Sequence, residues 1–401
     1  MPLPLRKSPD FIDKYLHYTK NTEPPEIYRK WCAVSTIAAS LQRKVSFSIG
    51  NEIAYPNFYI ILTGPSGEAR KSTALRQMQD LLFAAEITMT PSTCTREALI
   101  AKMSQHSDIQ TNDKGENIMH CSMTALVSEL SVFIDFGNDT FIMTLTDWFD
   151  CADNWSYETR SHQVEKIGNM FFNMIAATTD EWLRQSLSEK AVAGGLTSRI
   201  LFIYAPRIAK KIAIPGWGDD ELIMRDELLH DMEIFKQMSG PFVMDEEYEK
   251  EWISWYEGNH NVDFNSQRLL PYNSRRPLYM KKLSMVCSAS RSNEMICRKE
   301  DFKRALELLC EAEDRMDYVF GGMGMRKDAS VVGKIMRYIA MRGSVPMKDL
   351  VERFHFDMTW EDLNKTLDGL TRQRFSRKVI KEDGSEYIEL VNLKFKGMFK
   401  V

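Results

Sequence analysis

The stretch Asn57-Phe-Tyr-Ile-Ile-Leu-Thr-Gly-Pro-Ser-Gly-Glu-Ala-Arg-Lys-Ser-Thr73 joins an apolar run to a glycine-containing loop and then to Lys-Ser-Thr. The apolar run predicts a buried β-strand, and Lys71 is expected to open a helix. Backbone N–H groups of such a loop, a helix N-terminus and a lysine together form a cradle for an anion. We therefore expect a nucleotide-phosphate site made of Gly64, Pro65, Ser66, Gly67, Glu68, Ala69, Arg70, Lys71, Ser72 and Thr73.

This loop departs in two ways from the strict phosphate-loop pattern, G-x-x-x-x-G-K-[ST]. Six residues rather than five separate Gly64 from Lys71, and Arg70 stands where the pattern has its final glycine. Arg70 could contact a phosphate or a neighbouring subunit, and the sequence leaves both open. The alternative to a phosphate site is a Gly-Pro turn that joins a strand to an exposed basic helix.

The chain has 401 residues, of which 44 % are hydrophobic and 27 % charged, a composition typical of a soluble protein with two to three domains. The seven cysteines contain no C-x-x-C pair, which argues against a zinc site or a disulfide framework. No apolar run has membrane-spanning length, and no signal peptide is evident. We therefore expect a cytoplasmic protein without a membrane partner.

The order of predicted elements divides the chain into an N-terminal helical subdomain (1–45), an α/β core (46–215), a helical lid (216–325) and a C-terminal module (326–401). In the core, five apolar segments alternate with helical ones, which predicts a five-stranded parallel sheet with helices on both faces. The expected strands are 58–62, 87–90, 124–127, 171–177 and 200–204.

The C-terminal module has the pattern of a winged helix-turn-helix, with helices near 329–341, 347–354 and 359–373 and a β-hairpin wing at 377–390. It carries 16 Lys and Arg against 11 Asp and Glu, whereas the rest carries 36 against 45. A basic module on an acidic body is compatible with DNA binding, although winged helices also dock proteins. The expected DNA contacts in this module are Arg372, Arg374, Arg377 and Lys378.

Catalytic roles follow from where polar residues end the predicted strands. Lys71 is expected to contact the β- and γ-phosphates of ATP, and the Ser72 hydroxyl to ligate Mg²⁺. Ser128 and Glu129 follow a strand, so Ser128 is assigned to the Mg²⁺ shell and Glu129 to the metal and the attacking water. Thr178 ends another strand and is expected to contact the γ-phosphate or the water. The alternatives are that Glu129 and Thr178 merely cap the helices that follow.

Two further groups of basic residues complete the predicted sites. Arg199, just before the last core strand, is a candidate arginine finger, the alternative being a salt-bridged arginine at a strand edge. Arg275 and Arg276 open a lid helix; Arg276 is assigned as the second phosphate sensor, with Arg275 as the other choice. A hairpin between 155 and 166 offers Arg160 and Lys166 to DNA.

Four motifs in order carry a family resemblance: Gly-Pro-Ser-Gly-Glu-Ala-Arg-Lys-Ser-Thr at 64–73, Ser-Glu-Leu-Ser-Val-Phe-Ile at 128–134, Asn-Met-Ile-Ala-Ala-Thr-Thr-Asp-Glu-Trp-Leu at 173–183 and Gly-Gly-Leu-Thr-Ser-Arg-Ile-Leu-Phe-Ile-Tyr at 194–204. Over about residues 25–320 the chain resembles phage and mobile-element AAA+ ATPases of the primase/helicase-like group. More widely, it is similar to hexameric replicative helicases of the MCM type.

The resemblance implies an AAA+ P-loop core, ATP and Mg²⁺ as cofactors, and a hexameric ring that moves along single-stranded or forked DNA in a bacterial or phage-infected cell. It also implies that Ser198-Arg199 supplies an arginine finger to the next subunit. The longer loop and Ser128, which stands where many such ATPases have aspartate, put fast hydrolysis in question. An ATP-switched origin-binding initiator or helicase loader, and an interaction or defence ATPase whose winged helix binds protein, are the other readings.

Overall fold

The computed structural model describes residues 3–111, 117–134, 138–159, 162–186, 195–258, 260–262, 264, 269–320, 335–336, 338–339, 342–354, 359–372, 375–381 and 385–391. The chain forms two compact units, Met1–Phe320 and Gly321–Val401. The first unit contains the predicted regions 1–45 and 46–215 and residues 216–320 of the predicted lid. Within the described parts of the chain, the structure contains no helix with the length and apolar character needed to cross a membrane.

The main sheet of the first unit has the strand order β4-β5-β8-β3-β9. Its strands are β4 (Asp108–Thr111), β5 (Asn117–Val127), β8 (Met170–Thr178), β3 (Tyr59–Thr63) and β9 (Ile200–Tyr204). The last four pair in parallel, and every residue of β3, β8 and β9 is buried. Such continuously apolar strands are typical of a parallel sheet that is covered on both faces.

The prediction of five parallel strands needs a correction at the edge of this sheet. The fifth strand, β4, runs antiparallel to β5. The predicted strand 87–90 contributes a single parallel bridge, between Met89 and Thr124. Residues 87–90 end in Thr90-Pro91, and a proline cannot donate to a strand ladder, so the segment stays short.

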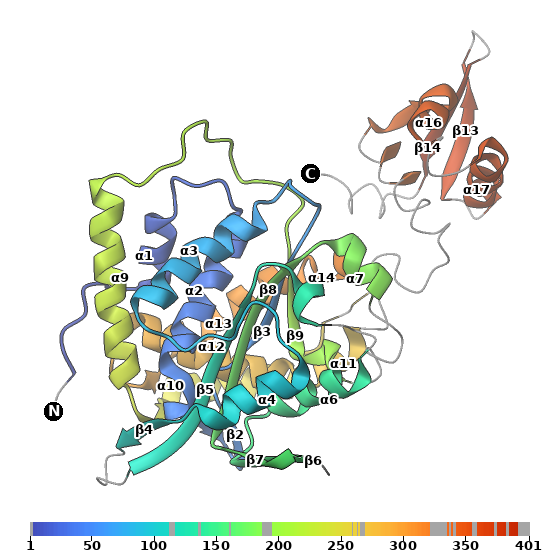
Figure 1. Ribbon diagram of the computed structural model, residues 1–401. Helices are drawn as coiled ribbons and strands as arrows, with labels where there is room; N and C mark the ends of the chain where they lie inside the picture. The colour runs from blue at the N-terminus through green and yellow to red at the C-terminus, as the bar shows by residue number, and fades with distance from the viewer. Residues whose placement is uncertain are drawn as a thin grey trace. The chain divides into compact units, whose positions relative to one another are not determined.

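Helices cover both faces of the sheet, as predicted (Figure 1). Consecutive residues of a strand point to opposite faces, and β8 illustrates this. The Asn173 amide donates to Ser35 of α2 (Glu26–Leu41), 3.1 Å away, whereas the ring of Phe172 packs on Trp148 of α6 (Asp139–Trp148). The other helices of the core are α1 (Phe11–Tyr18), α3 (Lys71–Ala84), α4 (Arg96–Gln105), α5 (Leu130–Phe133), α7 (Asp180–Ser186) and the short η1 (Gln42–Lys44) and η2 (Thr197–Arg199).

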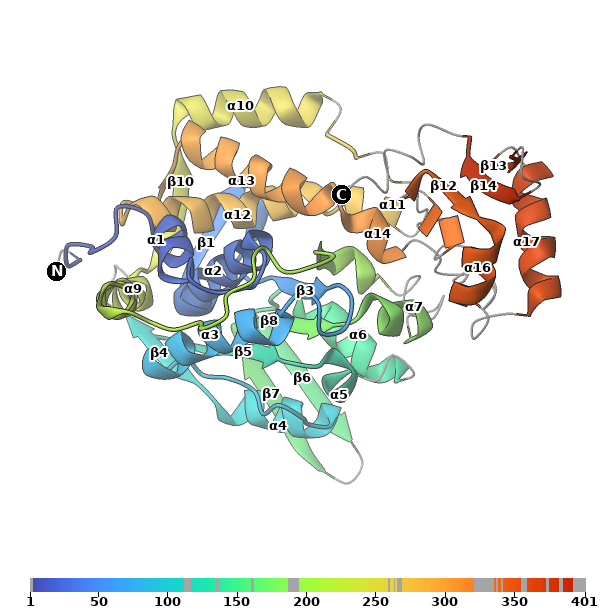
Figure 2. The same ribbon diagram turned by 90° about the horizontal axis from the view of Figure 1, so that it is seen from above.

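The region predicted to be a helical lid also contributes strands. Its helices are α9 (Asp219–Gln237), α10 (Glu246–Glu257), α11 (Leu270–Asn273), α12 (Arg276–Arg291), α13 (Lys299–Glu313) and α14 (Met316–Phe320). Strands β10 (Gly240–Met244) and β11 (Ile296–Cys297) join β1 (Val45–Ile49) and β2 (Glu52–Ala54) in a second sheet, ordered β11-β10-β1-β2. Seen from above, α10, α12 and α13 lie together on one side of the first unit (Figure 2).

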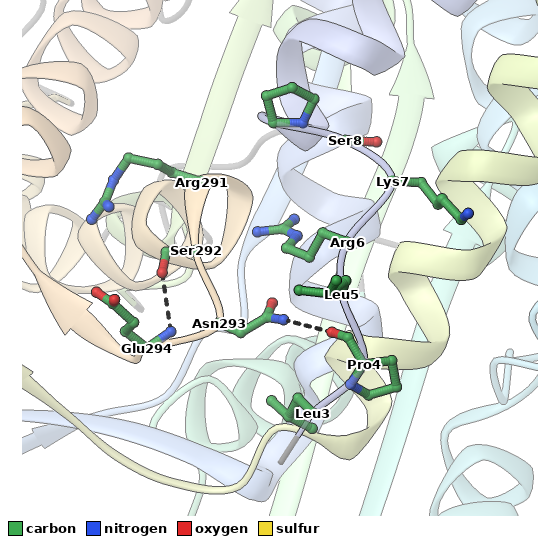
Figure 3. Close-up of a pocket in the computed structure, with 11 residues that line it drawn as sticks. Leu3, Pro4, Leu5, Arg6, Lys7, Ser8, Arg291, Ser292, Asn293 and Glu294 are labelled. Carbon is green, nitrogen blue, oxygen red and sulfur yellow. Dashed lines mark hydrogen bonds between the residues drawn. The ribbon is translucent and has the colours of Figure 1, made fainter.

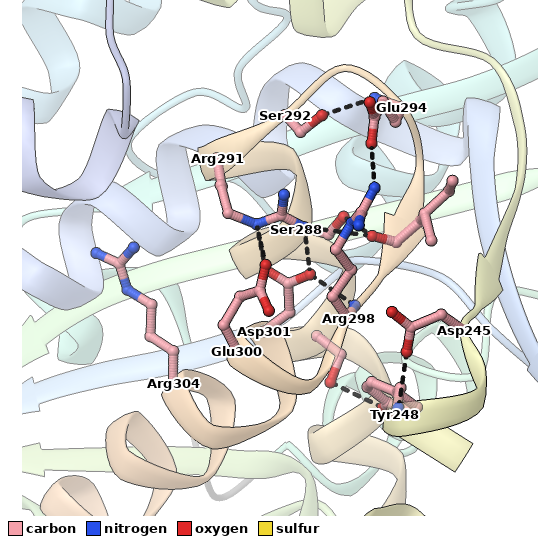
Figure 4. Close-up of polar contacts among 12 residues, drawn as sticks. Asp245, Tyr248, Ser288, Arg291, Ser292, Glu294, Arg298, Glu300, Asp301 and Arg304 are labelled. Atoms are coloured by element: carbon pink, nitrogen blue, oxygen red, sulfur yellow. Dashed lines mark hydrogen bonds and ion pairs between the residues drawn. The ribbon is translucent and has the colours of Figure 1, made fainter.

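Polar contacts connect the lid elements to the N-terminal segment before α1 and to one another. The Asn293 amide, just after α12, donates to the carbonyl of Pro4 in the hollow drawn in Figure 3. Further into the lid, Arg291 pairs with Asp301 at 2.7 Å, and Arg298 pairs with Glu294 at 2.8 Å (Figure 4). Arg298 and Glu294 are both exposed, so their pair contributes within about 1 kcal/mol to stability, whereas Asp301 of the other pair is buried.

The second unit pairs its strands in the order β12-β14-β13, all antiparallel. They are β12 (Ser344–Pro346), β13 (Ser376–Ile380) and β14 (Glu386–Leu390), with the helices α16 (Met347–Phe354) and α17 (Trp360–Arg372). The Thr359 hydroxyl accepts the N–H of Asp362 at 3.3 Å, which is half of the predicted capping box. Leu350, Leu367 and Ile388 lie in its buried core.

His120 on β5 makes folding stability sensitive to acid. Burial, and then the nearby Lys44 ammonium, lower the pKa of the His120 imidazole to about 4. Since an unfolded histidine titrates near 6.5, the unfolded chain takes up a proton first as pH falls. This contribution to stability is present above pH 6.5 and is lost between pH 6.5 and 4, at most about 3 kcal/mol.

We therefore expect His120→Gln to reduce the loss of unfolding free energy between pH 7 and pH 4, as measured by urea titration. His17→Gln, which changes an exposed histidine of α1, is the matched control. Identical pH dependence in the wild type and both variants would contradict this role of His120.

Candidate functional site

The loop 64–70 connects β3, which lies between β8 and β9, to α3 and folds as a tight turn. Two of its residues, Gly67 (φ 73°) and Arg70 (φ 51°), have left-handed backbone conformations. Gly64 is held so close to its neighbours that a Cβ there would lie 2.2 Å from the carbonyl oxygen of Ala205. A residue with any side chain at position 64 would therefore displace the backbone that carries the loop.

Lys71 is the buried first residue of α3, which does not fit the alternative of an exposed basic helix. Its Nζ donates to the carbonyl oxygens of Gly64, at 2.7 Å, and Pro65, at 2.9 Å. Burial lowers the pKa of this amine, while the carboxylates of Asp180 and Glu129 act in the opposite direction. The ammonium is thus held within the loop, where helix N–H groups have no intrahelical partners.

Glu129 and Thr178 lie together at the carboxyl ends of β5 and β8. The Thr178 hydroxyl lies 3.3 Å from Oε1 of Glu129 and donates to it. Although Glu129 occupies the N-cap position of α5, its side chain makes no capping bond to the helix backbone. The helix after β8 is capped instead by Thr179, whose Oγ1 accepts the N–H of Trp182. Within the described residues, neither Glu129 nor Thr178 therefore makes the capping bond considered above.

Asp180 is a site residue that the sequence analysis missed. It is buried at the start of α7, and its carboxylate pairs with Arg184 at 2.7 Å. It acts more strongly than Glu129 on the pKa of Lys71. The signal was an acid two residues after Thr178, at the carboxyl end of a buried strand, but helices commonly begin with acids, so the position looked structural.

Arg70 points away from the predicted phosphate site, and the roles expected of three hydroxyl residues are not tested by the structure. The Arg70 side chain leaves the loop and pairs with Glu23 at 2.7 Å, which lowers the pKa of that carboxyl. Ser72 and Thr73 are exposed in the first turn of α3, and Ser128 is exposed at the end of β5. Their roles with ATP and Mg²⁺ stay predictions. A magnesium ion that also binds nucleotide phosphates needs only one or two carboxylates, and Glu129 with Asp180 would meet that need.

Arg199 lies at the opposite end of the sheet from this cluster. Ile200 is level with Tyr59, whereas Tyr204 is level with Thr63, after which the loop 64–70 begins. The two ends of these strands are about 13 Å apart, at 3.3 Å per residue. Arg199 therefore cannot reach a phosphate bound at Lys71 of the same chain.

The two lid arginines have different surroundings although they are adjacent in sequence. Arg275 points to Asp150 and pairs with its Oδ1 at 3.2 Å, while Oδ2 of the same carboxylate pairs with Arg199 at 3.0 Å. Arg276 instead pairs with Glu313 at 2.7 Å, and both side chains are almost fully buried. Of the two candidates for a phosphate sensor, Arg275 is the one that shares a surface with Arg199.

The predicted DNA contacts fall on surface positions where the structure describes them. Lys166 is exposed on the hairpin of β6 (Asn154–Thr159) and β7 (His162–Gly168). Arg372 is exposed at the end of α17. Arg377 pairs with Glu389 and Lys378 with Asp368, each at 2.8 Å, so part of this basic charge is neutralised within the unit. Arg160 and Arg374 lie outside the described residues.

Comparison with known proteins gives no relative for this chain: no protein-family model and no curated protein matches it.

Gly64 and Gly67 provide a matched pair of variants for the loop. Gly64→Ala should lower the unfolding free energy by about 1–3 kcal/mol, since its Cβ would overlap the backbone of Ala205. At Gly67 no atom of the described residues lies within 4 Å of an added Cβ, so Gly67→Ala adds only the strain of the left-handed conformation, about 1 kcal/mol. Urea unfolding measures both. A Gly64→Ala protein as stable as Gly67→Ala would contradict the close packing of this loop.

We expect the Arg275→Ala and Arg276→Ala variants to differ in how much they lower the unfolding free energy. Arg276→Ala leaves the Glu313 carboxylate buried without its cation and should cost about 3–5 kcal/mol of unfolding free energy. Arg275→Ala removes a partly exposed pair and should cost less than about 1 kcal/mol. Thermal and urea unfolding of the two variants test this, and equal losses would contradict the assignment of Arg276 to the lid interior.

Proposed function

We propose that this protein is an ATP-dependent DNA helicase or translocase with an AAA+ P-loop core, working as a ring, with six copies as the resemblance implies. The observation that carries the proposal is the division of the charged groups between two ends of one parallel sheet. Lys71, Glu129 and Thr178 lie at one end, and Arg199 lies at the other. A second copy could supply its Arg199 where the first copy lacks one.

Within one active site, each residue has a distinct role in this proposal. Lys71 contacts the β- and γ-phosphates of ATP, and the N–H groups of the loop 64–70 surround the phosphates. The Ser72 hydroxyl, Glu129 and Asp180 would hold Mg²⁺, which would supply positive charge beside the phosphates. Glu129 orients the attacking water and accepts its proton, with the Thr178 hydroxyl holding the carboxylate in place. Arg199 of the next copy stabilises the charge that develops in the transition state.

For DNA, the proposal uses the second unit as a winged helix. Its helices, its three-stranded sheet and the exposed Arg372 support this assignment. Contacts from such residues to phosphates position a protein on DNA without reading its sequence. Lys166 on the β6–β7 hairpin is a second candidate contact, in the first unit.

An ATP-switched initiator or helicase loader is the second candidate function. Ser128 favours it, because an exposed hydroxyl holds a Mg²⁺-bound water less firmly than a carboxylate would. Such a protein would bind ATP, hydrolyse it slowly and bind one duplex sequence without separating strands.

ATP hydrolysis by the purified protein, with and without single-stranded DNA, tests the proposal. We expect single-stranded DNA to stimulate the wild type several-fold. Lys71→Ala should reduce kcat by about 100-fold or more, because the buried ammonium is lost from the phosphate site. Arg76→Ala, an exposed cation one turn further along α3, is the matched control and should keep wild-type activity.

Two results would count against the helicase. Slow hydrolysis that ignores single-stranded DNA, together with tight binding of one duplex sequence, would favour the initiator. Wild-type activity in Lys71→Ala would exclude the loop 64–70 as the catalytic phosphate site.

A further inference from the structure

A single carboxylate joins the two arginines that face away from the chain's own phosphate loop. Asp150 offers Oδ2 to Nη2 of Arg199 at 3.0 Å and Oδ1 to Nη1 of Arg275 at 3.2 Å. The three residues come from three separate elements: the turn after α6, the short helix η2 and the start of α12. Nothing in the sequence analysis assigned a role to Asp150.

The position of Asp150 is fixed by its neighbours in the chain. Phe149 and Cys151 on either side are buried, and the Phe149 carbonyl accepts the Asn57 amide at 2.9 Å. The backbone N–H groups of Asp150 and Cys151 donate to carbonyls of the last turn of α6. The carboxylate therefore projects from a rigid turn, with half of its side chain exposed (49 %).

The two arginines are held just as firmly at their backbones. Gly195 has φ 82°, and its carbonyl accepts from Nη1 of Arg199 at 3.1 Å; a Cβ on Gly195 would meet that same nitrogen. The N–H of Arg275 donates to the carbonyl of Tyr272 at 2.8 Å. The Tyr279 hydroxyl of α12 donates to the carbonyl of Ser198 and so connects the elements that carry the two arginines.

Asp150, Arg199 and Arg275 together carry a net positive charge, which favours binding of a further anion. Two guanidinium groups side by side repel each other, and one carboxylate between them reduces their joint charge from +2 to +1. Each arginine uses only one terminal nitrogen for Asp150, so other N–H donors are not committed to it. Arg199 Nε is buried and has no hydrogen-bond partner among the residues that the structure describes. A cavity of about 800 Å³, lined by Asp150 and Arg275 among others, opens beside them.

We propose that Asp150 is a positioning residue, which holds Arg199 and Arg275 together so that both act on the nucleotide bound by a neighbouring copy. The inference rests on the proposed function, since it needs a nucleotide at the phosphate loop of the neighbour. Asp150 itself does not touch that nucleotide. It fixes the direction of two flexible cations, and small misplacements of such groups are costly in rate.

Asp150→Asn tests this role. The amide keeps the shape of the side chain but offers one oxygen and no charge, so the two arginines separate. We expect kcat for ATP to fall about tenfold or more, with KM for ATP, ring assembly and single-stranded DNA binding nearly unchanged. Asp150→Glu, which restores the charge, should recover part of kcat. Asp147→Asn is the control: it removes a carboxylate one turn earlier on α6, which accepts from Trp155 Nε1 instead.

Mixing experiments distinguish an effect on the neighbour from an effect on the protein's own fold. Lys71→Ala subunits retain Asp150 and both arginines, whereas Asp150→Asn subunits retain the phosphate loop. If Asp150 acts across the interface, mixed rings of the two impaired variants should be more active than either variant alone. A merely structural role of Asp150 would give no recovery on mixing.

The outcomes separate this inference from the proposed function. If the wild type hydrolyses ATP but Asp150→Asn keeps full kcat, or if mixing restores nothing, the positioning role is overturned and the proposed function stands. If Asp150→Asn fails to fold, the same comparison is made with Asp150→Ser, which also removes the carboxylate, and full kcat in that variant would overturn the role. A wild type that neither binds nor hydrolyses ATP would overturn both.

Discussion

The common direction of β5, β8, β3 and β9 is the constraint on which the candidate site depends. These strands are buried, so their ladder cannot shift by a residue without exposing apolar side chains. Every residue that directly follows one of these strands therefore lies at one end of the sheet, and every residue that directly precedes one lies at the opposite end. Lys71 comes after β3 and Arg199 comes before the adjoining strand β9, so the two residues lie at opposite ends of the sheet.

Burial gives the Lys71 amine its particular environment. An ammonium removed from water needs compensation, and here it comes from two loop carbonyls and from the carboxylates of Asp180 and Glu129. A cation and two acids at one end of the sheet thus compensate each other's charge in the folded chain. In the proposed function, the same two carboxylates would serve as oxygen ligands of a metal bound to the nucleotide phosphates.

Arg275 and Arg276 are adjacent in the chain, but the turn of the helix directs their side chains to different partners. Arg276 turns inward to Glu313 and fixes the lid helices to each other, whereas Arg275 turns outward to Asp150. Because Asp150 also binds Arg199, the lid and the core share one charged surface. This surface, rather than either arginine alone, is the feature that the proposed ring would present to its neighbour.

The sequence by itself determined the α/β class, the strand before the loop 64–70, the helix from Lys71, and α16, α17 and the β13–β14 hairpin of the C-terminal unit, because these depend on local patterns of apolar residues, glycines and caps. Most of the helix predicted near 329–341 lies outside the described residues. The sequence could not determine that β4 runs antiparallel, that β1 and β10 form a second sheet, or that Asp180 belongs with Lys71. Nor could it join Asp150 to Arg199 and Arg275, which are 49 and 125 residues away in the chain. Such contacts arise only when the chain packs, since they depend on distances in space that the order of residues does not record.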